Sequence, residues 1–318
     1  MGSTELISKS RHFLIFCLAL LLGGILNGSS LKGQSVPSKL KSIPVYHTMV
    51  LNPAFVGSKD FTNISLTSRA LTSPNSQILN MHKRLSSTGG GFSSFGFGFY
   101  AFQEQFDNSW NSGLAMAGSY HYALDDKNLH NLSVGASFKG IFAIPKESAE
   151  SMPDSLSSKF RPNMDFGVYY YGPHWFAGLS STNLFGTNID GDSTLSYSDF
   201  ERHYHLHGGY KFLVSKKLGI VIEPSILVSV SDETFSELHK NIVPYLKVYL
   251  KNFYLGTYMK DLDIFALFFQ YQFPKFYTGV FLEFPRVGYL NDDNIIFEVS
   301  LGLNLGKGDP FFLKYRHW

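Results

Sequence analysis

Cysteine and charge are both scarce in this 318-residue chain. Cys17 is the only cysteine, and it lies inside an apolar stretch near the N-terminus. Charged residues make up 16% of the chain, whereas soluble proteins have roughly a quarter. Aromatic residues make up another 16%, and the mean hydropathy of −0.03 argues against a bundle of membrane helices. Few charges, many aromatics and moderate hydropathy together are typical of a membrane barrel, in which apolar and polar residues alternate.

The N-terminus predicts an exported protein. Residues 13–26 are apolar over about the length of a signal-peptide core, too short to cross a bilayer comfortably, and basic residues precede them. Cleavage after Ser30 or Gly33 fits the small residues there, and we favour Gly33, which makes residues 1–33 the signal peptide. Its removal takes away the cysteine, which excludes disulfides. It also leaves equal numbers of basic and acidic side chains, so there is no basic excess for binding nucleic acid.

Stretches with the period of an amphipathic helix are missing from about residue 60 onward. The chain instead alternates apolar and polar residues in segments separated by turn residues. We expect fourteen strands, most of them at least as long as the roughly 9–11 residues that a tilted membrane strand needs. Their expected ranges are 60–71, 76–84, 92–104, 109–123, 128–142, 163–171, 174–183, 201–214, 217–230, 236–250, 253–261, 264–273, 276–284 and 295–305.

The two faces of these expected strands differ in composition. Leu132, Val134 and Phe138 share one face of their strand, while Ser133 and Lys139 lie on the other. Apolar faces fit lipid, and faces rich in glycine, serine and isolated charges fit a wet lumen. Aromatic residues gather near strand ends, as in interfacial girdles: Tyr120, Tyr122, Tyr169, Tyr170, Tyr171 and Trp175. Five charges are expected inside, where we favour a cross-lumen network over solute selection: Glu223, Glu283, Glu298, Lys139 and Lys211.

Loop lengths favour a barrel over a soluble sandwich, whose strands would alternate in the same way. With a periplasmic N-terminus, every second connection should be a short periplasmic turn. Most of those connections are tight, and the longest ones, 143–162 and 184–200, fall on the opposite side. The sequence therefore predicts an all-β fold, a closed transmembrane antiparallel β-barrel of about 14 strands over residues 60–305. Closure satisfies every backbone polar group in lipid.

Two further segments flank the expected barrel. Residues 34–59 precede it and contain two turn signals. This segment is either a linker with two bends or an element that plugs the lumen or docks a periplasmic partner. Its candidate contact residues are Asn52, Pro53, Ala54, Phe55 and Gly57. Residues 306–318 form an aromatic C-terminal tail, which either turns back along the barrel or contacts a partner.

No pattern in the chain predicts catalysis or a cofactor. Its serines and histidines lack the spacing of a nucleophile with a partner base. His203, His205 and His207 share one face of a strand and make the strongest metal-like pattern. Neighbours on one strand face lie about 6.6–7 Å apart, too far for easy chelation by three in a row. We therefore expect neither a metal site nor an enzyme.

Several motifs resemble, in order and spacing, those of the PorP/SprF family, outer-membrane proteins of the type IX secretion system and its gliding machinery. The opening motif runs from Asn52 to Ser58, and Phe176 to Ser180 and Glu223 to Ser225 also match. Two further matches lie in the expected barrel: Arg161, Pro162 and Asn163, and then Arg202, His203 and Tyr204. The resemblance covers essentially the exported chain, although residues 60–104 match only by pattern. His205 and His207 replace a tyrosine or small residue typical of the family.

This resemblance implies a non-catalytic barrel in outer-membrane lipid. Its partners would be other type IX secretion components, or a secreted adhesin that it anchors at the cell surface. The rival interpretation is an outer-membrane porin or hydrophobic-solute transporter, which would need an open lumen. A second rival is an outer-membrane hydrolase, which a lipid-release assay would detect.

Overall fold

A computed structural model describes the part of the chain that forms the barrel and the segment before it. The described residues are 40–59, 61–69, 75–86, 92–105, 109–125, 129–145, 159–184, 202–231, 234–235, 241–260, 264–273, 275–284 and 295–306. The signal peptide expected in residues 1–33 lies outside these ranges, as do residues 34–39 and the tail beyond Gly306.

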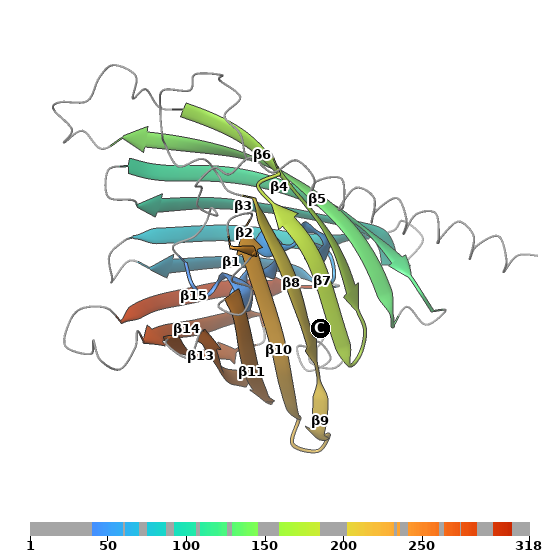
Figure 1. Ribbon diagram of the computed structural model, residues 1–318. Coiled ribbons are helices and arrows are strands. Elements are labelled where there is room, and N and C mark those ends of the chain that lie inside the picture. Colours follow the sequence, from blue (N-terminus) through green and yellow to red (C-terminus); the bar gives the residue numbers. More distant parts are fainter. Residues whose placement is uncertain are drawn as a thin grey trace, which may run out of the picture.

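Alternating sequence produces strands almost everywhere that it predicts them. Each strand pairs antiparallel with its neighbours in one sheet (Figure 1). The strands are β1 (Thr62–Arg69), β2 (Ser76–Ser86), β3 (Phe92–Gln105), β4 (Ser109–Ala123), β5 (Asn131–Pro145), β6 (Lys159–Tyr171), β7 (Trp175–Thr182), β8 (His203–Tyr210), β9 (Phe212–Ser215), β10 (Ile220–Ser231), β11 (Ile242–Leu250), β12 (Phe253–Lys260), β13 (Ile264–Gln272), β14 (Phe276–Phe284) and β15 (Ile296–Leu305).

The sheet closes on itself as a 14-strand barrel. β1 pairs with both β2 and β15, and β10 pairs with β11 as well as with β8, so the ring has no free edge. β8 and β9 both pair with β10, are separated only by Lys211, and keep the same register, with Gly209 opposite Ser225 and Phe212 opposite Ile222. These two pieces are therefore one path along the barrel, and the expected fourteen-strand closed fold is confirmed.

The outer and inner faces follow the predicted alternation. Leu114, Met116 and Phe138 are exposed on the outside, while Ser133 and Lys139 are buried inside. An exposed apolar outer face matches hydrocarbon, which offers no partner for polar groups.

Two tyrosines of the expected aromatic girdle lie elsewhere. Tyr169 and Tyr171 are only 3% and 5% exposed and face the lumen, while Tyr170 between them faces outward beside Trp175 at a centroid distance of 3.9 Å. The girdle prediction was wrong for Tyr169 and Tyr171 because alternate residues of a strand point to opposite faces. Three consecutive tyrosines therefore cannot share one interface.

Connection lengths distinguish the two ends of the barrel. The turns at 172–174, 216–219 and 251–252 all lie at one end, which we call the short-turn end. The long connections between β5 and β6 and between β7 and β8 lie at the opposite end. Short turns are periplasmic in outer-membrane barrels, so we expect the short-turn end to face the periplasm.

A chain segment that precedes β1 lies inside the barrel. Its helices are α2 (Ile43–Tyr46), α3 (Thr48–Leu51) and the 3-10 turn η1 (Pro53–Phe55), drawn in blue inside the ring of strands (Figure 1). We call residues 40–58 the lumen segment. None of the described helices is long and apolar enough to cross a membrane.

Candidate functional site in the barrel lumen

The motif from Asn52 to Gly57 forms a compact turn whose conformation its own residues set. The Asn52 side chain accepts a hydrogen bond from the Ala54 backbone N–H at 3.0 Å and so caps η1. Pro53 stands at the start of the turn, where its missing N–H leaves no bond unmade. Gly57 has φ of +73°, a conformation that glycine adopts without strain. The two turn signals of the sequence thus mark the entry to and the exit from η1.

This turn lies against barrel strands that carry glycine at the points of contact. A Cβ added at Gly135 of β5 would lie 2.5 Å from the Ala54 nitrogen, and one at Gly178 of β7 would lie 2.7 Å from Asn52 Nδ2. A Cβ at Gly167 of β6 would collide with Asn52 Oδ1. The glycines that predicted a wet lumen instead allow the backbone of the lumen segment to approach the wall.

Barrel serines and a histidine satisfy the carbonyl groups of the lumen segment. Ser180 Oγ donates to the Leu51 carbonyl at 2.6 Å, and Ser133 Oγ donates to the Ala54 carbonyl at 2.7 Å. His121 Nε2 donates to the Val56 carbonyl at 2.8 Å. Buried carbonyls without such partners would cost folding energy, so these polar wall residues replace the water that the carbonyls leave behind.

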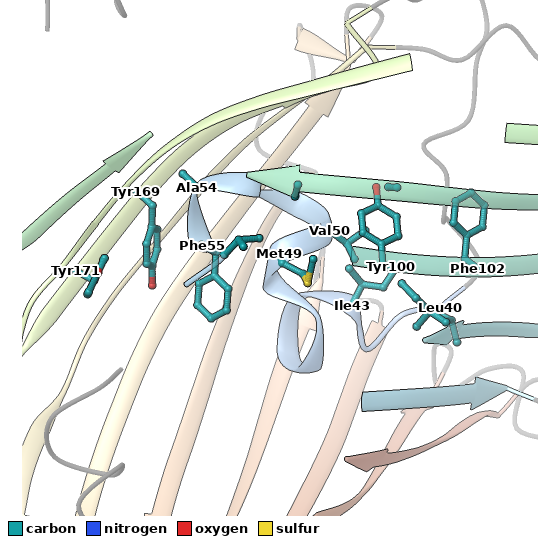
Figure 2. Close-up of a cluster of buried hydrophobic side chains, with 14 of the residues drawn as sticks. Leu40, Ile43, Met49, Val50, Ala54, Phe55, Tyr100, Phe102, Tyr169 and Tyr171 are labelled. Atoms are coloured by element: carbon teal, nitrogen blue, oxygen red, sulfur yellow. The ribbon is translucent and has the colours of Figure 1, made fainter. Parts of the chain in front are cut away.

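Apolar packing adds to these hydrogen bonds. Phe55 packs edge-on against Tyr169 and His82, with ring centroids 5.5 and 5.7 Å apart. Met49 and Val50 are buried, at 2% and 5% exposure, in a cluster that includes barrel aromatics (Figure 2). The other members of this cluster are Leu40, Ile43, Ala54, Phe55, Val56, Ile78, Tyr100, Phe102, Ala115, Ala117, Ile141, Tyr169, Tyr171 and Phe176.

The N-terminal part of the lumen segment is attached to β15 and to the strands before it. Glu298 accepts hydrogen bonds from the backbone N–H groups of Lys41 and Ser42 at 2.7 and 3.0 Å. The Tyr46 hydroxyl lies 3.1 Å from the Phe269 carbonyl on β13. With η1 held by β5 to β7, the segment is bound to opposite sides of the barrel wall.

His47 links the lumen segment to β1 and β2. Its Nε2 lies 2.6 Å from Thr67 Oγ1, and its Nδ1 contacts Asn80 Nδ2. Burial lowers the pKa of His47 to about 3, because the apolar surroundings disfavour the charged imidazolium. A neutral ring that donates through Nε2 and accepts through Nδ1 fits both partners.

The five predicted lumen charges all point inward, and their partners lie on nearby strands or on the lumen segment. Lys139 Nζ lies 2.6 Å from Asp165 Oδ1, between β5 and β6. Glu223 on β10 pairs with Lys211 at 3.3 Å and with Lys247 of β11 at 3.6 Å. Glu283 accepts a bond from the Tyr258 hydroxyl, and Glu298 holds the lumen segment. The lumen segment, rather than a charge network, therefore crosses the interior.

The three strand histidines have separate environments. His205 lies between hydroxyls, with Thr182 Oγ1 3.2 Å from Nε2 and Ser229 Oγ 2.8 Å from Nδ1. His203 stacks on His205 at a centroid distance of 6.2 Å, and His207 packs edge-on against Phe176. In the described part of the chain, no group of three or more histidine, cysteine or acidic side chains is arranged to hold a metal ion.

The remaining motif residues lie at the end opposite the short turns. Arg161 pairs through its backbone with Ile141, and its side chain lies outside the described residues. Asn163 is buried inside and Pro162 is exposed on the outside of β6. Arg202 precedes β8, whose Tyr204 ring packs against Phe235 at 5.7 Å. The hydrogen bonds described for the lumen segment's motif go instead to Ser133, Val168 and His121.

Several residues that hold the lumen segment were missed in the sequence. Ser133, Ser180 and His121 are separated from their partners by 79, 129 and 65 positions. No local pattern specifies such distant pairs. The one local signal is the abundance of glycine and serine on the inner face of β3 to β7. It predicts a water-filled lumen, but it equally fits close contact with a chain segment.

One protein-family model matches most of the chain. A model of the type IX secretion system membrane protein family PorP/SprF matches residues 45–303. No match was found among curated proteins.

Solved structures show weaker similarity. A KdgM porin shares 11% identity over 77% of this chain and 99% of its own, with a TM-score of 0.35. BamA from Haemophilus ducreyi lacking POTRA domains 1–3 shares 10% over 77% and 70%, with a TM-score of 0.37. The beta domain of the Bordetella autotransporter BrkA shares 10% over 77% and 98%, with a TM-score of 0.33. Similarities this low carry no argument about function.

The family match extends from inside α2 to near the end of β15, and so includes both the lumen segment's motif and the closed barrel. The chain therefore belongs to the PorP/SprF family of type IX secretion system membrane proteins, and it is an outer-membrane β-barrel.

Proposed function

We propose that this chain is a non-catalytic barrel that assembles with other type IX secretion components or anchors a secreted adhesin at the cell surface. The observation that supports a binding role over transport is the occupied lumen. The lumen segment is hydrogen-bonded to opposite walls, through Leu51 and Ala54 on one side and through Ser42 on the other. An anchored segment of this kind obstructs a solute path and holds the barrel in one shape.

Co-purification tests the proposal. The native protein, tagged at low copy number and extracted from intact membranes in mild detergent, should retain type IX components or a surface adhesin. An unrelated outer-membrane barrel with the same tag, extracted from the same membranes, is the control. Recovery of the same proteins with both baits, or of no secretion component at all, would reject the proposal.

Single-channel recording separates this function from the porin alternative. The purified barrel in a planar bilayer should be electrically silent, because the lumen segment occupies its interior. Stepwise conductance of the full chain would favour a porin or transporter instead.

A further inference from the structure

A cavity remains between the lumen segment and the short-turn end of the barrel. Its volume is about 180 Å³, and Tyr46 and His47 of the lumen segment form its inner boundary. Asn252, Gln272 and Asn304 line it close to the turns and are half-exposed, so it opens toward the periplasm. The volume is below the roughly 300–1,000 Å³ of drug-sized pockets, which suits a single side chain or a small anion.

The described lining of this cavity contains three lysines and one carboxylate. The lysines are Lys59, Lys211 and Lys247, and the carboxylate is Glu223. Glu223 lies within 3.3 Å of Lys211 and 3.6 Å of Lys247, so two ammonium groups share one acid. Tyr249 donates its hydroxyl to the same carboxylate at 3.0 Å. The cavity is thus rich in positive charge, in surroundings where charges interact more strongly than in bulk water.

Lys59 directly follows the lumen segment in the chain and lines the cavity. Its ammonium lies 5.7 Å from the ring centroid of Phe55 and 5.6 Å from that of Phe61. Burial, followed by the like charge of Lys247, lowers the pKa of Lys59 to about 8. A bound anion would relieve this crowding of like charges.

We propose that this cavity is a binding site for a carboxylate side chain presented by an acidic segment of a periplasmic protein partner. The inference rests on the proposed function in one respect, that the partner is a protein of the secretion machinery. The chemistry of the lining supports a peptide. Besides the lysines, the amides of Asn63 and Gln270 and the Tyr254 ring line the cavity, and amides can pair with peptide N–H and C=O groups.

A binding titration tests the site on the full-length barrel in detergent. The probe is a short fluorescein-labelled peptide in which glutamate alternates with glycine, followed by fluorescence anisotropy. The same peptide with glutamine in place of glutamate is the matched control, and inorganic phosphate is the competitor that tests for a phosphate site. The glutamate peptide should bind, the glutamine peptide should bind at least about tenfold more weakly, and added salt should weaken binding.

Three variants locate the site. Lys59→Gln should raise the Kd for the glutamate peptide roughly tenfold, because a charge-assisted bond is lost. Glu223→Gln should lower the Kd, since it removes the internal competitor for the lysines. Lys216→Gln changes an exposed lysine in the turn before β10 and should have no effect. Heat-modifiability on gels confirms that each variant is folded.

Three results would overturn the inference. Equal binding of the glutamate and glutamine peptides, or equal effects of Lys59→Gln and Lys216→Gln, would mean that no specific carboxylate site exists. Binding of inorganic phosphate in a calorimetric titration, without binding of the glutamate peptide, would assign the cavity to phosphate groups instead. In each case, co-purification of secretion components with the native barrel would leave the proposed function standing.

Discussion

At the scale of single residues, the close fit of the lumen segment to the wall depends on glycines, which lack a side chain, as much as on side chains that donate hydrogen bonds. Gly135 and Gly167 leave room for backbone and amide atoms, while Ser133 and Ser180 supply hydroxyls beside them. The wall of β5 to β7 is therefore a complementary surface, shaped to the motif that begins at Asn52.

Gly135→Ala tests this complementarity. The new Cβ would lie 2.5 Å from the Ala54 nitrogen, and overpacking of this kind costs about 1–3 kcal/mol. We expect a lower free energy of unfolding in urea and faster proteolysis within residues 40–58. Gly118→Ala is the matched control, because Gly118 faces outward with no atom within 4 Å of the added Cβ. Equal stability of the two variants would contradict a tight fit.

Asn52→Ala tests the cap and the wall contact together. The Asn52 side chain accepts from Ala54 N–H and donates to the Val168 carbonyl, both at 3.0 Å. Loss of a cap alone costs about 0.5–2 kcal/mol, and the lost donor adds to that cost. Urea unfolding should therefore give a lower free energy of unfolding for Asn52→Ala. Asn52→Ser can keep the cap but is too short to reach the Val168 carbonyl, so its free energy of unfolding should fall by less. A larger loss in the serine variant would argue against the capping role.

His47 gives the lumen segment a dependence on pH. Its pKa is about 3 in the folded protein and 6.5 when unfolded, so the unfolded chain binds the extra proton between these values. Stability is therefore complete above pH 6.5 and falls as pH drops toward 3, by up to about 1.4 kcal/mol per unit. His47→Gln keeps a donor and an acceptor but does not titrate. The difference in free energy of unfolding between wild type and this variant should therefore shrink from pH 6.5 to 5, by up to about 1.4 kcal/mol per pH unit. A constant difference would show that His47 does not titrate as described.

At the scale of elements, the sequence predicts those features that depend only on the residues of a single strand. The period of two placed all fourteen strands, because lipid on one side and protein on the other impose alternation within a single segment. The break at Lys211 was not predicted, because the chain keeps one register against β10 on both sides of it, and only a gap in the pairing with β10 at Tyr210 and Lys211 separates β8 from β9. Helices in the lumen segment were also missed, because four-residue helices are too short to show a period.

The same limit applies to the candidate site. Asn52-Pro53 and Gly57 predicted bends, and the bends are present. Where the bent segment lies depends on contacts with Ser133 and Glu298, which are distant in sequence and belong to different strands. Turn chemistry is local, whereas docking depends on the assembled wall, so the sequence alone is compatible with both a linker and a segment inside the lumen.

The pairing of β5 with β6 includes a buried ion pair that a double-mutant cycle can measure. Lys139 and Asp165 are both about 1% exposed, and Asp165 also accepts from Ser137 Oγ and Asn183 N–H. Removing one partner of a buried pair costs about 3–5 kcal/mol, because it strands the other charge. Lys139→Met and Asp165→Asn should each destabilise the barrel by this amount in urea, and the double variant by clearly less than their sum. Additive losses would show that the two groups do not interact.

At the scale of the whole molecule, the barrel and the lumen segment form one folded unit. The segment's carbonyls meet serines of the wall, its apolar side chains fill the interior, and Glu298 is satisfied by the segment's backbone. A wall that buries serine and glutamate on its inner face cannot form a dry core by itself, since those polar groups would lack partners. Without the segment, water must enter.

Deletion of residues 40–58 tests this dependence and the transport alternative together. The closed ring of strand pairing involves none of these residues, so the deleted barrel should still fold and remain heat-modifiable on gels, with a lower unfolding midpoint. Water and ions should then fill the lumen, and single-channel recordings should show conductance that the full chain lacks.

A synthetic peptide of residues 40–58 should reduce that conductance when it is added from the periplasmic side, while a peptide of the same composition in scrambled order should not. Co-purification of secretion partners should be lost along with the closed lumen; a folded, silent deletion variant that still retains its partners would show that the segment is only a linker.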